Sequence, residues 1–229
     1  MQPYFFPYIG YWQLVNAVDK YVVFDDVNYI KRGWINRNRI LFNGKPRYFN
    51  VYLKGVSQNK LINEIEVDND EKLIRKNISI ITEAYRKAPF FQEIFPLIES
   101  ILYNETKNLA RYNANILYSI NKYLGIQTEI IFSSEIKKSN YLKGQEKIIN
   151  ICKELRATDY YNAIGGRELY TQEKFLQNGM DIFFLCPKHI EYKQFGNDFY
   201  ENLSIIDVMM FNPKEKIQSF LSDYILVTQ

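Results

Sequence analysis

The chain has 229 residues, enough for one domain with a sizeable hydrophobic core. Its 47% hydrophobic and 24% charged content is typical of a globular protein, and a net charge of +3 is too small to indicate a nucleic acid or a membrane as the partner. There is no apolar run of transmembrane length and no signal-peptide pattern, so we expect a cytoplasmic protein whose two cysteines stay reduced.

The first forty residues combine features that a plain core segment does not need. Two prolines predict an extended entry, and Gly10 permits a tight turn into a short helix. Residues 21–24 form a predicted buried strand with Asp25 and Asp26 at its carboxyl end, where ligands bind in open α/β sheets. These carboxylates suit a metal, a general base or contacts to ligand hydroxyls, and a structural cap is the alternative.

A loop and a small hairpin follow. The turn Asn43-Gly44 predicts a hairpin between residues 40–42 and 48–53. The loop before it brings together an indole, two amides and a guanidinium, which suit a sugar or a nucleotide unless the loop bonds only to itself; they belong to Trp34, Asn36, Arg37 and Asn38.

A basic window spans the loop and the hairpin, because no acidic residue occurs between Asp26 and Glu64. It suits a phosphate-bearing ligand or an acidic acyl carrier protein, and a solvated basic loop is the alternative. The basic residues are Lys31, Arg32, Arg37, Arg39, Lys45, Arg47, Lys54 and Lys60.

Residues 68–124 change to a helical pattern. Three helices are predicted: one capped by Asp68 or Asn69 and stopped near Pro89, one over residues 90–103, and one from the cap Thr106 to Gly125. We expect this helical insertion to carry no chemistry.

The second half alternates strands and helices. Residues 128–132, 159–163 and 181–185 are predicted strands, separated by helices over 143–155 and 167–177. This order predicts a mostly parallel, Rossmann-like three-layer sheet, and hence a single α/β domain over residues 1–229 with the helical insertion at about 68–124. Gly165-Gly166 before a helix suits a phosphate, and a plain turn is the alternative.

The tail predicts two helices. Ser204 is the expected cap of the first, with Asp207 at the capping-box position, so we expect both residues to have structural roles first of all. Pro213 suits the first position of the last helix.

Several kinds of chemistry are disfavoured. His189 is the one histidine, and neither cysteine has metal or redox spacing, so we expect neither a catalytic triad nor a zinc site. Cys152 falls on an apolar helical face and reads as a core thiol. We therefore expect no metal, and a carboxylate or tyrosine as any general base.

Several separated motifs resemble the WbqC-like family in order and over nearly the whole chain. They are MQPYFFPYIGYWQLVNAVDKYVVFDDV, GWINRNRI, YYNAIGGRELY, EYKQF and LSIIDVMMFN. The resemblance implies a bacterial protein of O-antigen or other surface-polysaccharide biosynthesis that handles nucleotide-linked amino sugars.

Carried over by position, the resemblance implies two groups of site residues. The catalytic carboxylates would be Asp25 and Asp26. The substrate-binding residues would be Gln2, Pro3, Tyr8, Gly10, Tyr11, Trp34, Asn36, Arg37, Asn38, Asn162, Gly165, Gly166, Tyr170, Tyr192 and Gln194.

One departure concerns the start. Members of the family usually carry a few apolar residues before the MQP motif, which would form a first strand, whereas this sequence begins at that methionine. The resemblance therefore implies either a truncated start or the absence of a central strand.

The preferred hypothesis is an enzyme that transfers an acyl or aminoacyl group to the amine of a nucleotide-linked amino sugar. No fixed cofactor is indicated; acyl-CoA, a carrier-protein thioester or an adenylate would be the co-substrate. Arg37 would hold the pyrophosphate and an aspartate would accept the amine proton. The alternatives are a nucleotidyltransferase-like enzyme, suggested by the Pro-x-x-Gly-Tyr turn, and a binding protein that docks an acyl carrier protein or a glycosyltransferase.

Overall fold

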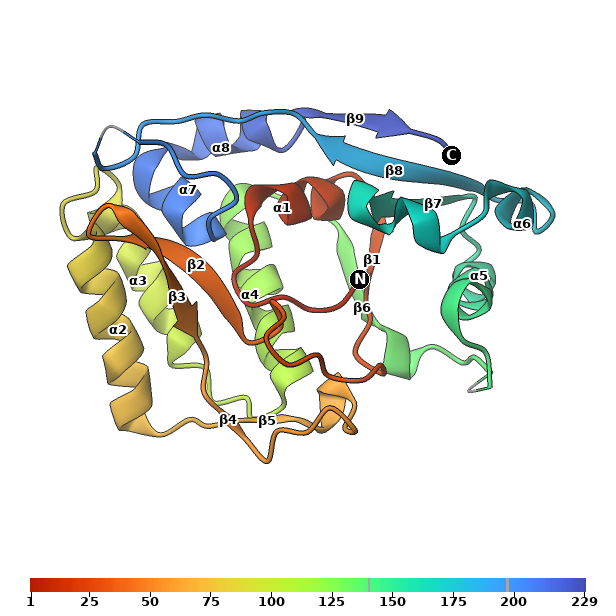
Figure 1. The fold of residues 1–229 in the computed structure, drawn as a ribbon, viewed down its shortest axis with the longest axis horizontal. Coiled ribbons are helices and arrows are strands. Elements are labelled where there is room, and N and C mark those ends of the chain that lie inside the picture. Colours follow the sequence, from red (N-terminus) through yellow and green to blue (C-terminus); the bar gives the residue numbers. More distant parts are fainter. Residues whose placement is uncertain (140, 197) are drawn as a thin grey trace.

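The computed structural model describes residues 1–139, 141–196 and 198–229 (Figure 1). The fold is mixed α/β, as predicted. Within the described residues the strands form four small sheets, β1–β6, β2–β3, β4–β5 and β7–β8–β9, with helices packed around them. The predicted single sheet is therefore divided into parallel pairs.

The amino-terminal part follows the expected order. Helix α1 (Ile9–Asn16) leads into β1 (Lys20–Val23), and β2 (Arg37–Phe42) pairs with β3 (Lys45–Asn50) as the predicted hairpin. Asn43 and Gly44 both have positive φ, +49° and +74°, which the right-handed twist of a two-residue hairpin turn requires. Two short strands, β4 (Leu53–Lys54) and β5 (Glu66–Val67), flank the 3₁₀ helix η1 (Ile62–Glu64).

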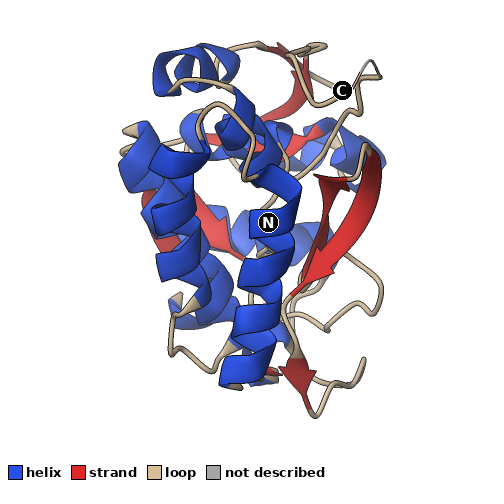
Figure 2. Cartoon of the chain, turned by 90° about the vertical axis from the view of Figure 1, so that its left-hand side faces the viewer, coloured by secondary structure: helices blue, strands red, loops and turns tan. Residues whose placement is uncertain are grey.

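The three predicted helices are present as α2 (Glu71–Tyr85), α3 (Phe91–Leu102) and α4 (Leu109–Leu124). Helices α2 and α3 pack on each other, and α2 also packs on β2 (Figures 1 and 2). Two expected caps were wrong: Asp70 caps α2, and Asn108 replaces Thr106 as the cap of α4. The amide of Asn108 is suited to the position because it accepts from Arg111 N while donating to Asn63 O.

The second half supplies two parallel pairs. Strand β6 (Glu129–Phe132) pairs with β1, and β7 (Asp159–Ala163) pairs with β8 (Asp181–Pro187). Strand β9 (Tyr224–Val227), which the sequence pattern did not predict, adds antiparallel to β8. The remaining elements are η2 (Ser133–Glu135), α5 (Gly144–Glu154), η3 (Ile164–Leu169), α6 (Gln172–Leu176), α7 (Ile205–Phe211) and α8 (Lys214–Phe220).

The helix predicted over residues 167–177 is interrupted. A 3₁₀ segment, η3, ends at Leu169, and Tyr170 adopts an extended conformation before α6 begins. The ring of Tyr170 packs against Tyr160 and Phe175, with centroids 5.6 and 6.0 Å away. This packing stabilises the extended conformation of Tyr170, at a position where helical periodicity alone predicts that the helix continues.

Two hydrophobic clusters hold these elements together. The larger one contains the entry segment, the three helices of the insertion, α7 and α8. The smaller one lies between α5, α6 and β8, and includes Cys152, Phe175 and Phe184. Burial raises the pKa of the Cys152 thiol to about 11, so its predicted role as a core thiol is confirmed.

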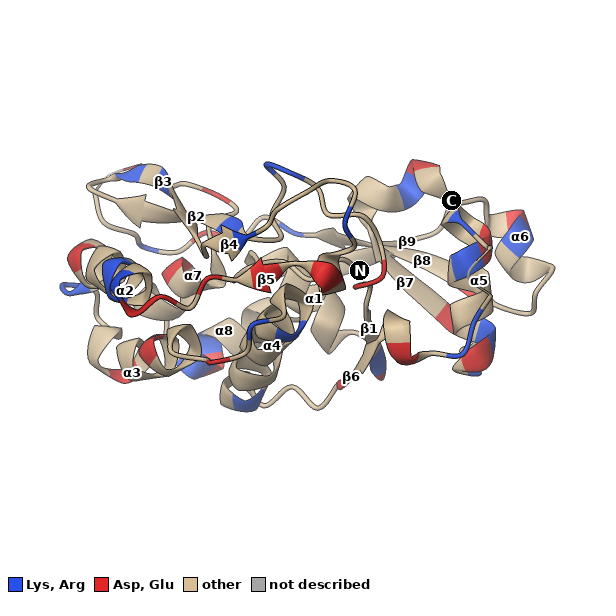
Figure 3. Ribbon diagram, turned by 90° about the horizontal axis from the view of Figure 1, so that it is seen from below, with Lys and Arg blue, Asp and Glu red and all other residues tan. Residues whose placement is uncertain are grey.

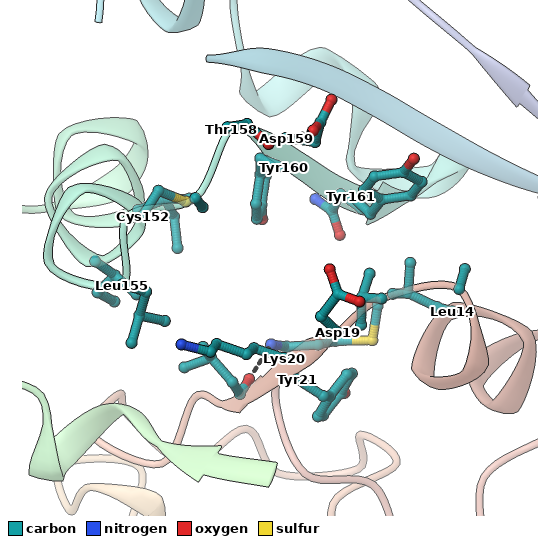
Figure 4. Close-up of a pocket in the computed structure, with 18 of the residues that line it drawn as sticks. Leu14, Asp19, Lys20, Tyr21, Cys152, Leu155, Thr158, Asp159, Tyr160 and Tyr161 are labelled. Carbon is teal, nitrogen blue, oxygen red and sulfur yellow. Dashed lines mark hydrogen bonds between the residues drawn. The ribbon is translucent and has the colours of Figure 1, made fainter. Parts of the chain in front are cut away.

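Strands β1 and β7 face each other across a cavity of about 400 Å³, which we call the strand cleft (Figure 4). Leu14 of α1 and Cys152 and Leu155 of α5 line it, and the charges of Asp19 and Lys20 lie at its rim. The backbone of Met1 lies along β1 here: its ammonium donates to Val22 O at 2.7 Å, and Phe24 N donates to Met1 O at 2.8 Å. The strand cleft is what separates the two parallel pairs.

No helix in the described ranges combines the length and hydropathy needed to cross a bilayer.

Candidate functional site

A larger cavity, of about 660 Å³, opens beyond the carboxyl ends of β1, β7 and β8; we call it the aromatic pocket. This is the end at which ligands bind in parallel α/β sheets. Ten predicted site residues line it: Gln2, Tyr8, Gly10, Tyr11, Trp34, Asn38, Asn162, Gly165, Gly166 and Tyr170. Segments far apart in the sequence thus meet in one place.

The lining also contains residues that the sequence did not indicate as site residues. They are Met1, Tyr4, Phe24, Arg39, Ile148, Tyr160, Ala163, Ile164, Leu169, Leu185, Pro187 and Asn202. Most are apolar or aromatic and carry no sequence signal that distinguishes them from core residues. Arg39 did have a signal, because it belongs to the basic window.

The entry segment is held in place by side chains from distant elements. Asn38 on β2 donates to both Phe5 O and Phe6 O, at 3.1 and 2.9 Å, and the Ser204 hydroxyl donates to Phe6 O at 2.8 Å. These bonds stabilise Phe6 at a φ of +41°, a conformation uncommon for a bulky residue. Asn38 therefore shapes the pocket as well as lining it.

A second set of contacts holds the ends of the same segment. Asn113 on α4 donates to Pro3 O at 3.0 Å and to Ile35 O at 2.7 Å, and the Trp12 indole donates to Pro7 O at 3.0 Å. Pro3 is itself buried and lies outside the lining. Asn113 belongs to the helical insertion, which was expected to carry no chemistry. The insertion does contribute to the site, because Asn113 holds the entry segment in position.

Gly10 allows the ring of Tyr8 to lie against the backbone of α1. A Cβ added at position 10 would lie 2.4 Å from Tyr8 Cε2 and 2.9 Å from Pro187 Cγ. Any side chain there would force the tyrosine ring or Pro187 to move. The Pro-Tyr-Ile-Gly-Tyr turn thus needs glycine for close packing, although its φ is not positive.

Tyr4 and Tyr8 both line the pocket with half-buried side chains. Neither hydroxyl makes a hydrogen bond to another described residue in this structure. Burial raises the pKa of both phenols, and the neighbouring Tyr4 raises that of Tyr8 further. Both hydroxyls are therefore neutral near pH 7 and can donate a hydrogen bond to a ligand.

The opposite wall is formed by β7 and the turn after it. Asn162 Oδ1 accepts from Ala163 N at 2.9 Å, and its amide nitrogen lies 2.5 Å from where a Cβ of Gly166 would be. Tyr160 OH lies 3.3 Å from Tyr170 OH. This wall offers amide and hydroxyl groups without a formal charge, and such groups can both donate hydrogen bonds to ligand hydroxyls and accept from them.

Two of the residues predicted to bind substrate, Asn36 and Arg37, lie outside the pocket lining. Arg37 does not line the pocket: its Nε donates to Gly33 O at 3.1 Å and its guanidinium also bonds to Arg32 O. Arg37 therefore braces the loop that carries Trp34. Asn36 is likewise engaged, accepting from Tyr29 OH at 2.8 Å.

Asp25 lies at the carboxyl end of β1, as predicted, but it does not reach the pocket lining. Its carboxylate is 2% exposed and accepts from Ser134 N at 2.9 Å, from Ser134 Oγ at 2.6 Å and from Asn63 at 3.3 Å. These contacts join β1 to η1 and η2.

Asp26 is held by two lysines. Lys138 Nζ lies 2.9 Å and Lys147 Nζ 3.1 Å from the same carboxylate oxygen, Oδ2. Burial would raise the pKa of Asp26, but its contacts with Lys138 and Lys147 lower it overall. Like Asp25, it lies outside the lining, so the pocket has no carboxylate among its described residues.

Tyr192 and Gln194 meet at Asp207 instead of at the pocket. The buried carboxylate accepts from Tyr85 OH at 2.8 Å, Tyr192 OH at 2.7 Å and Gln194 Nε2 at 2.8 Å. Burial raises the pKa of Asp207 to about 6 against the opposing effect of these three donors. The expected capping-box role of Asp207 is not seen, because Ser204 N donates to Arg39 O.

Ionisable groups are scarce around the pocket. Arg39 is the only arginine, lysine, aspartate, glutamate or histidine side chain in its described lining. Across the described residues, no group of three or more histidine, cysteine, aspartate or glutamate side chains is placed to hold a metal ion. Elsewhere on the chain, charges of both signs are interspersed (Figure 3).

Residues 2–219 match the WbqC-like protein family. The chain belongs to this family. The match extends over both walls of the aromatic pocket and the residues that hold the entry segment. A curated relative, the uncharacterized protein Rv1507c of Mycobacterium tuberculosis, is 28% identical over 225 residues, which cover 96% of this chain and 95% of the relative. No solved structure matches the chain.

Proposed function

We propose that this protein is a transferase of bacterial surface-glycan (O-antigen) biosynthesis. Its acceptor is a nucleotide-linked amino sugar, and the group transferred to the sugar amine is an acyl or aminoacyl group. The observation that supports this best is the aromatic pocket itself: seven aromatic residues and four neutral amides make up half of its 22 lining residues, and Arg39 adds one positive charge. That combination suits a sugar joined to an anionic nucleotide.

The reaction joins the amine nitrogen to the carbonyl carbon of a thioester donor. The carbon–sulfur bond breaks, and the proton lost by the attacking amine leaves with the thiolate as a free thiol. Acyl-CoA or a carrier-protein thioester supplies the donor. An acyl adenylate is the second donor class, with AMP as the leaving group.

Tyrosines take the polar role in this proposal. The hydroxyls of Tyr4 and Tyr8 are neutral donors facing the pocket, and a neutral donor stabilises the negative charge that develops on a carbonyl oxygen during acyl transfer. Asp25 and Asp26 act at a distance, by holding η1, η2 and α5 to the end of β1. This replaces the expectation that one of them accepts the amine proton.

The test is a thermal-shift screen of purified protein against dTDP-, UDP- and GDP-linked amino sugars. Each amino sugar is paired with the sugar that carries a hydroxyl group in place of the amine. A ligand at about a hundred times its dissociation constant stabilises the folded state by roughly 2.7 kcal/mol. Ligands that raise the melting temperature are then incubated with acyl-CoA, and the products are examined by mass spectrometry.

A stabilising amino-sugar nucleotide that gains one acyl group supports the proposal. Stabilisation without acylation by any thioester or adenylate donor would leave a binding protein, and a salt-sensitive complex with an acyl carrier protein would then indicate docking. No stabilisation by any nucleotide sugar would refute the acceptor assignment.

A nucleotidyltransferase-like activity is the second candidate, favoured by one observation. The turn that contains Tyr8, Gly10 and Tyr11 opens α1 directly at the pocket. A helix amino terminus at this end of a parallel sheet suits a phosphate group. Release of pyrophosphate from ATP in the presence of a sugar phosphate would support this activity over acyl transfer.

A further inference from the structure

Among the side chains that line the aromatic pocket, formal charge is confined to one end. Arg39 lies on β2 at the side of the pocket where Trp34 and Asn202 also contribute. The wall made by Asn162, Gly166 and Tyr170 carries amide, backbone and hydroxyl groups only. A ligand with one anionic end and one neutral polar end therefore has a preferred orientation in this pocket.

Arg39 has an unused buried donor. Its Nε is buried and has no hydrogen-bond partner in the described part of the chain, while its guanidinium lies 5.8 Å from the centroid of the Trp34 ring. A buried N–H of a permanently charged group is costly when it lacks an acceptor. The basic residue next to it on the same strand face, Arg37, already has two backbone carbonyls as acceptors. Arg39 is thus the arginine that an incoming anion satisfies.

The amino end of α1 adds a second group that attracts anions. The helix spans eight residues, its N-cap Tyr8 makes no side-chain capping bond, and no acidic residue occupies its first turn. Tyr8 and Gly10 both line the pocket, so the uncapped end of the helix faces it. The positive end of the helix dipole favours a negative group, and this observation is independent of Arg39.

Exposed aromatic rings continue from Arg39 towards solvent. Trp34 is 37% exposed and Tyr48 is 50% exposed, and their ring centroids are 6.3 Å apart. The guanidinium of Arg37 covers the other side at 4.3 Å from the Tyr48 centroid. Large aromatic rings left open beside a cationic group provide a stacking surface for a planar base.

We propose that the nucleoside diphosphate half of the ligand binds at this end. The diphosphate lies against Arg39 and the amino end of α1, the base stacks on Trp34, and the amino sugar points towards Asn162 and Tyr170. This assignment rests on the proposed function in taking the ligand to be a nucleotide sugar. It goes further by fixing which end of the ligand each wall recognises.

Titration calorimetry with UDP, dTDP and GDP and the matching nucleosides tests the anion subsite. The wild-type protein is expected to bind at least one diphosphate more tightly than its nucleoside. Arg39→Gln should remove that preference, because the affinity for the diphosphate should fall about 10- to 100-fold, the loss expected for a charged hydrogen bond. Arg39→Lys should restore part of it. Arg47→Gln is the matched control, because Arg47 stacks on Phe42 and lies outside the pocket lining.

The sugar end is tested with the corresponding amino-sugar nucleotide. Asn162→Ala should lower the affinity for the sugar nucleotide to about that for the free diphosphate. The affinity for the free diphosphate itself should not change. Base stacking is read from fluorescence: Trp12 is fully buried, so quenching on titration should come from Trp34 and disappear in Trp34→Phe. Circular dichroism melts of each variant confirm that it is folded.

The outcomes separate the two proposals. Arg39-dependent diphosphate binding without any acyl transfer would support this orientation and refute the enzyme assignment. Acyl transfer that is insensitive to Arg39→Gln would support the function and overturn the orientation. Absence of diphosphate binding to the wild-type protein at millimolar concentration, or an effect of Asn162→Ala on the free diphosphate equal to that of Arg39→Gln, would also overturn the orientation.

Discussion

Met1 lies opposite Val23, on the edge of β1 that faces away from β6. The Met1 ammonium donates to Val22 O and the Met1 carbonyl accepts from Phe24 N, at 2.7 and 2.8 Å, which is the pair of bonds that a residue makes with a parallel neighbour. On the far side of the strand cleft, β7 presents its own free edge. The cleft is therefore bounded by the edges of two strands that each belong to a parallel pair, and α1 and α5 cover it. A central strand of a parallel sheet has such surroundings.

We predict that an extended apolar segment placed ahead of Met1 stabilises the protein. Four or five residues such as Val and Ile would continue the pairing of Met1 along β1, reach β7 and bury side chains between Leu14 and Cys152. Each buried side chain contributes about 1.5–3 kcal/mol, and ordering the backbone costs about 1–2 kcal/mol per residue. We expect a net gain of roughly 3 kcal/mol in the free energy of unfolding, measured by urea denaturation.

A Gly-Ser extension of the same length is the control for this prediction. It has the same reach but little β propensity and no apolar side chain to bury. Equal stability of the two extended proteins would show that the cleft does not accept a strand.

Asp26→Asn should destabilise the fold strongly. Lys138 is 3% exposed and Lys147 14% exposed, so removing the carboxylate leaves two largely buried ammonium groups without their counter-charge. Loss of one partner of a buried ion pair costs about 3–5 kcal/mol. Chemical denaturation measures the loss, and combining Asp26→Asn with Lys138→Met should recover part of it. A loss below about 1 kcal/mol would mean that the lysines find other partners.

The same carboxylate gives a pH dependence of known sign. The pKa of Asp26 is lowered in the folded state, so its contribution is present above the pKa of the unfolded chain, near 4, and is lost as the pH falls through the folded value. The difference in stability between wild type and Asp26→Asn should therefore shrink below pH 4. A constant difference would contradict the ion-pair explanation.

Asp207 gives a pH dependence of the opposite sign. Its pKa rises from 3.8 to about 6 on folding, so the folded state binds the proton more tightly and stability falls as the pH rises from about 4 to 6. A shift of this size corresponds to about 3 kcal/mol. Urea denaturation of wild type and Asp207→Asn should show this slope in the difference between their stabilities, because the contributions of the other carboxyl groups are shared by both proteins and cancel.

Gly10→Ala should disturb the pocket without touching a polar group. The added methyl group would meet Tyr8 and Pro187 at less than 3.0 Å, and crowding of this kind typically costs about 1–3 kcal/mol. Displacement of Tyr8 should also weaken nucleotide-sugar binding. Gly165→Ala is the matched control for stability, because no atom lies within 4 Å of its added Cβ. Equal stabilities of the two variants would show that the Tyr8 contact is dispensable.

Turns and helix ends could be predicted from the sequence where adjacent residues determine them. Asn43-Gly44 predicts its hairpin because only a turn with two positive φ values matches the twist of the strands, and Gly125 ends α4 at a φ of +77° as expected. The motifs that resemble the WbqC-like family contain most of the residues that line the pocket, although only ten of the 22 were named as site residues. These predictions depend on residues adjacent in the chain, or on patterns within one element.

The hydrogen-bond partners of the polar side chains could not be predicted in this way. Asp25 and Arg37 were expected in the site because they are polar and lie near a strand end or in a loop, and Gln194 because the resemblance to the WbqC-like family implies it. In the folded chain they are bonded to Ser134, Gly33 and Asp207, whereas Arg39 retains a free donor at the pocket. A hydrogen bond depends on distances between segments that are far apart in sequence, so composition and periodicity do not specify it.

The sequence by itself determined the α/β class and the order of most elements, because hydrophobic periodicity and turn residues act over short distances. The segments that meet at the pocket were indicated by the resemblance to the WbqC-like family. Only the tertiary structure decided which polar groups face the ligand and which hold the framework. It also decided that β1 and β7 stand apart across the strand cleft, since strand pairing is settled by packing between elements that the sequence order leaves open.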